Sequence, residues 1–202
     1  MSFSSLLLFV GVYAAAVATP GPGVAAVVAR VLGQGLGGVA PFIAGFVVGD
    51  LLWFAVAATG LAVLAHEFAT VFSLIRYAGV AYLLSLAWRI WRAPVGASHD
   101  AVAPRGGARP FLGALSLTLG NPKVIVFFLS IMPLVVDVHA MSATTFVEVA
   151  AIMPFVLAPV LGAYALAANR ARALFRSPRA MTMVNRGAAG VMAGVAIVIA
   201  AR

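Results

Sequence analysis

The sequence contains no cysteine, and only 9% of its 202 residues are charged. The absence of cysteine excludes disulfides and thiolate metal sites. Soluble domains contain about 25% charged and about 45–50% apolar residues, whereas 64% of this chain is hydrophobic and its mean hydropathy is +1.11. A soluble fold of this size has no interior large enough for so much apolar surface. The composition therefore predicts a membrane protein.

Six apolar runs are long enough to cross a bilayer as helices, which takes about 20 residues each. They lie at roughly 3–29, 39–64, 71–91, 111–135, 146–168 and 183–201. Strands of a membrane barrel alternate in polarity over about 10 residues, and these runs do not. The Ala-Val-Ala at 16–18 resembles a signal-peptidase site, but no basic segment precedes it, so we expect the first helix to be retained. The prediction is an all-α integral membrane protein with about six transmembrane helices.

Basic residues are concentrated in alternate connections between these runs. Ten of the 13 are Arg30, Arg89, Arg92, Arg105, Arg109, Arg170, Arg172, Arg176, Arg179 and Arg186. The other connections carry His66 and Glu67, then Asp137, His139 and Glu148. Since cytoplasmic loops are enriched in Arg and Lys, this pattern predicts that both termini lie outside. The net charge of +8 then indicates topology and contact with anionic lipids, and we expect no nucleic-acid partner.

The chain divides into two halves of three predicted helices each. Residues 1–92 form the first half, 93–110 a cytoplasmic linker rich in Pro, Gly and Ala, and 111–202 the second half. The first helix of each half is interrupted, by "TPGPG" at 19–23 and by "GNPK" at 120–123. An odd number of spans per half makes the halves run in opposite directions. The sequence predicts two inverted three-helix repeats, with the substrate site at the proline-broken helices.

Two charged residues, one of each sign, lie well inside predicted spans, away from the span ends. Asp50 stands in "GFVVGDLLWF", and Lys123, the only lysine, follows Pro122. A carboxylate inside a bilayer costs at least about 2.5 kcal/mol and is a candidate functional group by default. Counted from the helix ends, Asp50 and both interruptions fall near the middle of the membrane. An Asp50–Lys123 ion pair is the obvious hypothesis, either as part of a site or as a structural clamp.

The interruptions suggest a chemistry of their own. Asn121 is suited to cap a restarting helix with Pro122 at its first position, and Thr19 before Pro20 is suited to do the same. A restarted helix presents free N–H groups that favour a carboxylate, and the carbonyls freed before it favour an ammonium group. An α-amino acid carries both groups. The alternative is a simple proline kink without a ligand.

Further signals in the sequence are weaker. Pro154 and Pro159 indicate hinges or kinks in the fifth helix, and Gly45 and Gly49 form a GxxxG pattern that permits close helix contact. His66, His99 and His139 show no metal-binding spacing, and there is no nucleotide loop and no recognisable catalytic set. We therefore expect no metal, no cofactor and no enzymatic activity.

Together these motifs resemble the lysine and homoserine/threonine exporters (LysE/RhtB type). The resemblance rests on "PGPG", "GFVVGD", "YAGVAYLLSLAWRIWR", "NPKVIVFFLSIMP" and "NRGAAGVMAGVAI", in this order along nearly the whole chain. It implies a bacterial inner membrane and proton-driven export of amino acids or related metabolites. The family signature positions are Pro20, Gly21, Pro22, Asp50, Asn121, Pro122 and Lys123. The family usually has Asn after PGP, where this chain has Gly23, so its substrates are open.

The sequence thus predicts a secondary transporter that works by alternating access and proton antiport. The predicted substrate-binding residues are Pro20, Gly21, Pro22, Gly23, Asn121, Pro122 and Lys123. The helix ends near Gly21–Gly23 and Pro122–Lys123 hold the substrate carboxylate, while Asp50 binds the ammonium group or the coupling proton. The alternative is a membrane scaffold or lipid-handling protein whose helix breaks only shape the bundle. A homo-oligomer remains open.

Overall fold

The computed structural model describes residues 3–59, 108–132, 136 and 141–174, with isolated residues between 77 and 92 and between 182 and 197. Within these residues all regular structure is helical. Two helices are long and apolar enough to cross a membrane, or up to four if each bent pair is one span. The predicted third and sixth spans, and most of the linker, lie outside the continuously described residues.

The first predicted span is two helices, α1 (Phe3–Ala18) and α2 (Pro22–Gln34), bent by 53° at the predicted interruption. Pro22 stands at the first position of α2, where its missing N–H costs no helical hydrogen bond. The residue before it, Gly21, is extended and caps α2 without a side chain. Glycine also ends α2, since Gly35 has a φ of 71° that favours a residue without a side chain.

The fourth predicted span is broken in the same manner. It consists of α6 (Ala108–Leu119) and α7 (Pro122–Val126), and the bend between its two parts is 54°. A π-helical turn, η1 (Phe127–Ile131), continues α7. The sequence predicted the break, but nothing in its apolar pattern distinguishes a π-helical turn from an α-helical one.

The second and fifth predicted spans are single helices, α3 (Val39–Ala58) and α9 (Ala143–Leu174). The 32 residues of α9 extend beyond the predicted 146–168 at both ends. Ser142 explains the earlier start, because its hydroxyl accepts the backbone N–H of Thr145 at 3.1 Å and caps the helix. Pro154 and Pro159 lie inside α9, which continues through both.

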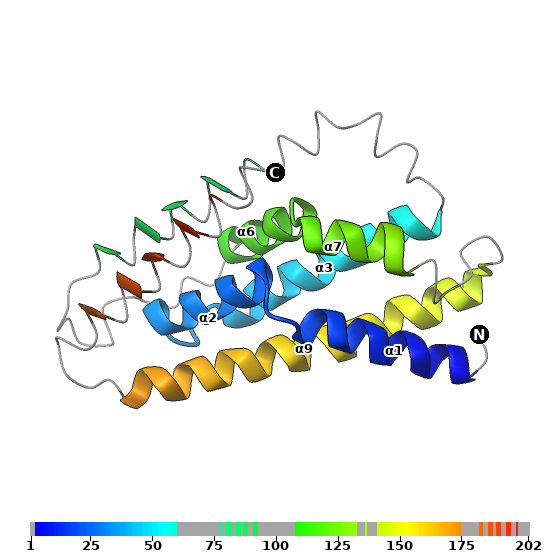
Figure 1. The fold of residues 1–202 in the computed structure, drawn as a ribbon, viewed down its shortest axis with the longest axis horizontal. Helices are drawn as coiled ribbons and strands as arrows, with labels where there is room; N and C mark the ends of the chain where they lie inside the picture. Colours follow the sequence, from blue (N-terminus) through cyan, green and yellow to red (C-terminus); the bar gives the residue numbers. More distant parts are fainter. Residues whose placement is uncertain are drawn as a thin grey trace.

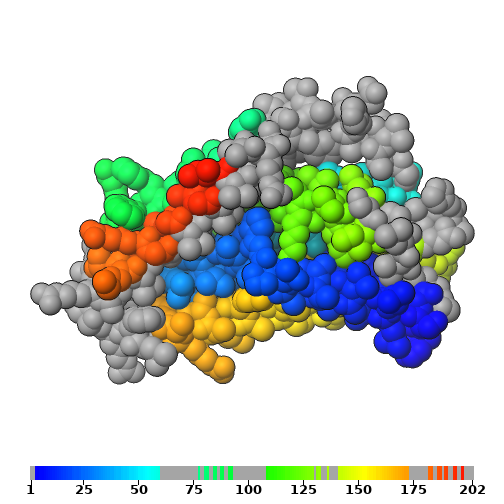
Figure 2. Space-filling view, in the orientation of Figure 1, coloured from blue at the N-terminus to red at the C-terminus, as the bar shows by residue number. Residues whose placement is uncertain are grey.

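The described helices form a bundle in which the broken spans run in opposite directions (Figure 1). From α1 to α2 the chain runs away from the N-terminus, and from α6 to α7 it runs back toward that end. Both α1 and α2 pack on α9, and α3 packs chiefly on α6. Figure 2 shows α1 and α2, in blue, along one face between α9 below and α7 above.

The contact between α3 and α6 depends on two glycines one helical turn apart. A Cβ atom on Gly45 would lie 2.3 Å from the carbonyl oxygen of Phe111, and one on Gly49 would lie 2.5 Å from Cβ of Thr118. Neither position has room for a side chain. The GxxxG pattern therefore does what the sequence suggested, and it brings α3 against α6 within one chain.

Candidate functional site

The second helix break is built as the sequence predicted. Asn121 is extended, and its side-chain Oδ1 accepts the backbone N–H of Lys123 at 3.1 Å. Pro122 occupies the first helical position of α7. Asn121 is buried, with 4% of its surface exposed, so its amide is held firmly at the restart of the helix.

The first break differs from the prediction in its capping residue. Gly21, and not Thr19, caps α2, because the helix begins at Pro22 and not at Pro20. The hydroxyl of Thr19 instead donates to the carbonyl of Ala15 at 2.7 Å, one turn back in α1. With no side chain capping α2, its first-turn N–H groups face the break.

Lys123 joins the two breaks. Its Nζ donates to the backbone carbonyl of Thr19, at the point where α1 ends. Its side chain also crosses Gly21, where an added Cβ would lie 3.1 Å from Cδ of Lys123. Gly21 therefore permits the lysine to approach, and the carbonyl end of α1 accepts an ammonium group from the other half of the chain.

Asp50 is buried in the middle of α3, with 5% of its surface exposed. Its Oδ2 accepts the hydroxyl of Tyr13 at 2.7 Å. The hypothesised direct ion pair between Asp50 and Lys123 is absent, because their polar atoms bind Tyr13 and Thr19 instead. The two opposite charges still attract one another across the site. The structure thus brings Asp50, Lys123 and both breaks together.

Sequence reasoning missed two tyrosines at this place. Tyr13 is 1% exposed in α1, and Tyr164 in α9 donates its hydroxyl to the carbonyl of Ala18 at 2.7 Å. Both residues lie in apolar runs where they resemble ordinary packing residues. The signal that was available is the phenol hydroxyl, which needs a polar partner when it lies inside a membrane helix.

Gly23 lies against an aromatic ring of α3. A Cβ atom at this position would lie 3.1 Å from Cε1 of Phe46, and Phe46 is itself buried edge-to-face against Phe42. The asparagine that is usual in the resembled family would therefore meet this ring. Gly23 and Phe46 make the wall of the break apolar at this point.

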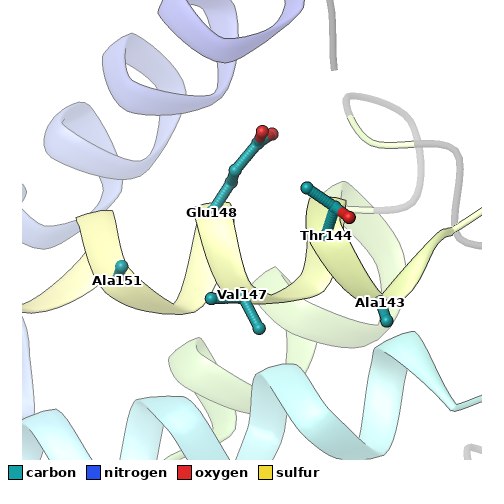
Figure 3. A pocket seen from close by; sticks show the side chains of 5 residues that line it. All are labelled: Ala143, Thr144, Val147, Glu148 and Ala151. Carbon is teal, nitrogen blue, oxygen red and sulfur yellow. The ribbon is translucent and has the colours of Figure 1, made fainter.

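A surface cavity of about 600 Å³ is lined by residues other than these groups. Ala143, Thr144, Val147, Glu148 and Ala151, at the beginning of α9, line it. Figure 3 shows Thr144 and Glu148 projecting from the same side of the helix. None of the predicted site residues borders this cavity. Within the described part of the chain, no group of three or more His, Cys, Asp or Glu is placed to hold a metal ion.

The fold and the site define a multi-pass helical membrane protein in which two broken helices meet beside a buried carboxylate, an arrangement found in secondary transporters. The family model described as "LysE type translocator" matches residues 14–202, and the chain belongs to this family. It is therefore classed with transport proteins and not with enzymes.

Two efflux proteins are similar to this chain over part of its length. A leucine efflux protein of Salmonella typhimurium (strain LT2) is 34% identical over 128 residues, which is 61% of this chain and 59% of that protein. A homoserine/homoserine lactone efflux protein of Salmonella typhi is 27% identical over 169 residues, 83% of this chain and 82% of that protein. The match thus spans less than two thirds of the leucine efflux protein. No solved structure matches the chain.

Proposed function

We propose that this protein exports amino acids or related small metabolites across the bacterial inner membrane by alternating access, driven by proton antiport. The observation that carries the proposal is the meeting of the two helix breaks, where Lys123 of α7 bonds the carbonyl end of α1 close to Asp50. The names of the relatives, leucine and homoserine/homoserine lactone efflux proteins, support this substrate class.

In the proposed binding mode the substrate carboxylate lies at the start of α2. No side chain caps the N–H groups there, and the ammonium group of Lys123 lies beside Gly21. A helix N-terminus and a cation both favour a carboxylate. The signature residues Pro20, Gly21, Pro22, Gly23, Asn121 and Pro122 shape this place by ending one helix and beginning the next.

Asp50 has one of two roles in this proposal. It either binds the substrate ammonium or receives the coupling proton from outside and releases it inside. The wall formed by Gly23 and Phe46 is apolar. If Asp50 and Lys123 bind the ammonium and carboxylate groups of the substrate, neither is left to bind a charged side chain. A substrate side chain without charge, such as that of leucine or homoserine, suits this site best.

Two inverted repeats account for the packing of the described helices. The two breaks have bends of 53° and 54° and a proline at the first position of the following helix. In such a repeat the first span corresponds to the fourth, and the second span to the fifth. The packing of the first span (α1 and α2) on α9 then corresponds to the packing of α6, from the fourth span, on α3. These correspondences support the repeat, and rocking of one half against the other is the proposed movement.

The proposed orientation places both termini outside the cell. The end of α2, the start of α6 and the end of α9, which carry arginines, lie together at the end of the bundle opposite the N-terminus (Figure 1). Arg30 is buried there and donates to the carbonyl of Gly37 at 2.9 Å. The positive-inside rule supports a cytoplasmic location for this end.

The direct test is transport by purified protein in liposomes. Vesicles are loaded with labelled leucine or homoserine, a pH gradient is imposed, and efflux is compared with that of protein-free vesicles. We expect saturable, gradient-dependent efflux with at least one of the two substrates. Absence of efflux with both, and with a mixture of the other protein amino acids, would contradict the proposal and favour the scaffold or lipid-handling alternative.

A further inference from the structure

We infer that Tyr13 is the latch of an aromatic gate that separates Asp50 from the N-terminal end of the bundle. The inference rests on the proposed function, in which a cation, either a substrate ammonium or a proton, reaches Asp50. It adds a positioning residue, Tyr13, which is not among the family signature positions, and a closing element.

The gate is a cluster of four aromatic side chains. Phe9 and Tyr13 of α1 stack with their ring centroids 5.6 Å apart and their planes at 11°. The Tyr13 centroid lies 5.7 Å from that of Phe127 and 6.2 Å from that of Phe128. All four are buried, with at most 6% of their surfaces exposed. We call Phe9, Tyr13, Phe127 and Phe128 the aromatic gate.

The gate lies on one side of the breaks. Its residues come from α1, before the first break, and from η1, after the second, and both segments lie toward the N-terminal end of the bundle (Figure 1). One turn beyond Asp50 in α3, Phe54 stacks on Phe146 of α9 with centroids 4.9 Å apart. This pair adds an aromatic contact between α3 and α9 to the one between α1 and η1, so apolar side chains separate Asp50 from this end.

The π-helical turn contributes directly to the gate. Phe127 and Phe128 are consecutive, and their rings pack edge to face with centroids 5.1 Å apart. In the wider π-helical turn of η1, both neighbours reach the ring of Tyr13. Such turns are rare and recur at functional sites. The irregular turn is thus located where the two halves of the chain close on each other.

Tyr13 connects the gate to the charge of Asp50. Its ring belongs to the gate, while its hydroxyl donates to Asp50 Oδ2 at 2.7 Å. Among the described residues, the charged or titratable groups that act on Asp50 are Tyr13 from α1 and Lys123 from α7. A hydrogen bond to a carboxylate is stronger than one to a neutral group. A cation that occupies Asp50 therefore weakens the bond to Tyr13 and releases the latch.

The chain is well suited to a labelling test because it contains no native cysteine. Val17 is partly buried in α1, one turn beyond Tyr13 on the same helix face and on the far side of the gate. A Val17→Cys variant is treated with a membrane-impermeant maleimide in sealed vesicles of both orientations, sorted by the accessibility of an N-terminal tag. The rate of labelling reports how often the gate opens.

Tyr13→Phe keeps the ring and removes the latch. Loss of a hydrogen bond to a charged group predicts an increase in labelling of about tenfold or more, and only from the side of the N-terminus. Asp50→Asn retains an acceptor oxygen without charge, so we expect a rate between those of the wild type and Tyr13→Phe. The double variant should label no faster than Tyr13→Phe, since both changes break the same bond.

Tyr164→Phe is the matched control, because it removes a hydroxyl bond of the same 2.7 Å length to the same helix without affecting Asp50. We expect it to leave labelling from the N-terminal side within twofold of the wild type. Equal increases in Tyr13→Phe and Tyr164→Phe, or increases from both sides of the membrane, would indicate general loosening of α1 and overturn the gate.

A second variant covers the case in which Tyr13→Phe does not fold. Phe128→Ala removes one buried ring and should also raise labelling from the N-terminal side, whereas unchanged labelling in folded protein would overturn the gate. The assay needs no transport. If the protein exports leucine but is labelled equally with and without the Tyr13 hydroxyl, only the gate is contradicted. If labelling depends on the Tyr13 hydroxyl but the protein exports nothing, only the proposed function is contradicted.

Discussion

At the scale of single residues, Asp50 and Lys123 are the two charged residues beside the helix breaks, and each has a partner that does not cancel its charge. Tyr13 donates a neutral hydroxyl to Asp50, and the Thr19 carbonyl accepts from Lys123. Hydrogen bonds of this kind offset part of the cost of burial while leaving the charges available. In a direct ion pair the two charges would have neutralised each other, and neither would have been free to bind a ligand.

Asp50→Asn distinguishes the two roles proposed for this residue. The variant keeps size and hydrogen-bonding capacity but cannot bind a proton. If Asp50 carries the coupling proton, we expect loss of gradient-driven efflux and retention of substrate exchange between equal pools. If it binds the ammonium group, both activities fall together with a weaker apparent affinity. Both are measured side by side in liposomes with matched amounts of folded protein, and wild-type rates in both would remove Asp50 from the mechanism.

Lys123→Ala should weaken substrate binding more than it lowers protein abundance, because the ammonium group lies beside the uncapped start of α2. We expect at least a tenfold loss in affinity, as is typical for a hydrogen bond to a charged group. Lys123→Met is the matched control, since it keeps an apolar stem against Gly21 and removes only the charge. Normal binding by a variant that melts much earlier would identify Lys123 as a structural clamp.

The sequence predicted one of the two helix caps, but not the hydrogen-bond partner of Asp50. Asn121 caps α7 as expected, because the cap, the proline and the helix are adjacent in sequence. Thr19 does not cap α2, since α2 begins at Pro22 after the extended Gly21. The Thr19 hydroxyl instead donates to a carbonyl of α1. Tyr13 meets Asp50 across 37 positions, and no local pattern indicates which face of α1 turns toward α3.

At the scale of helices, the contact between α3 and α6 is the most sensitive to added volume. Gly45→Ala places a Cβ atom against the backbone of α6, at 2.3 Å from the Phe111 carbonyl. Because backbone cannot rotate away, we expect destabilisation by about 1–3 kcal/mol, the usual cost of overpacking. Thermal unfolding in detergent measures it.

Gly162→Ala in α9 is the control for this substitution. An added Cβ atom there meets nothing within 4 Å, and alanine is the better helix former by about 1 kcal/mol. We expect the melting temperature to stay the same or rise. Equal losses at Gly45 and Gly162 would show that the contact between α3 and α6 is looser than this packing indicates.

The apolar runs predicted the helices but not all of their ends. The broken spans were visible because Pro and Gly interrupt otherwise continuous runs. α9 extends beyond the predicted span at both ends, because Ser142 caps an earlier start and the helix continues through the arginines after residue 168. The π-helical turn depends on tertiary packing between consecutive phenylalanines and α1, so the hydropathy pattern does not predict it.

At the scale of the whole molecule, the described helices give the inverted-repeat hypothesis a specific form. The broken spans run in opposite directions (Figure 1), and each packs on the unbroken second helix of the other half. The sequence predicted the opposed directions from an odd number of spans, whereas the exchange of partners between halves required coordinates. In the proposed function, rocking of one half against the other would act on both breaks, because each broken span packs on the other half.

Orientation in the membrane gives the last prediction, and it tests the arginine pattern as a whole. Single cysteines replace Leu36, in the connection between α2 and α3, and Thr144, at the start of α9; both residues are exposed. Since no native cysteine competes, an impermeant maleimide added to spheroplasts should label Thr144→Cys within minutes and Leu36→Cys only after lysis. Single cysteines at Asp100 and Phe175, in the other arginine-bearing connections, should behave like Leu36→Cys. Labelling of Leu36→Cys before lysis would reverse the orientation, and with it the direction in which a gate next to α1 opens.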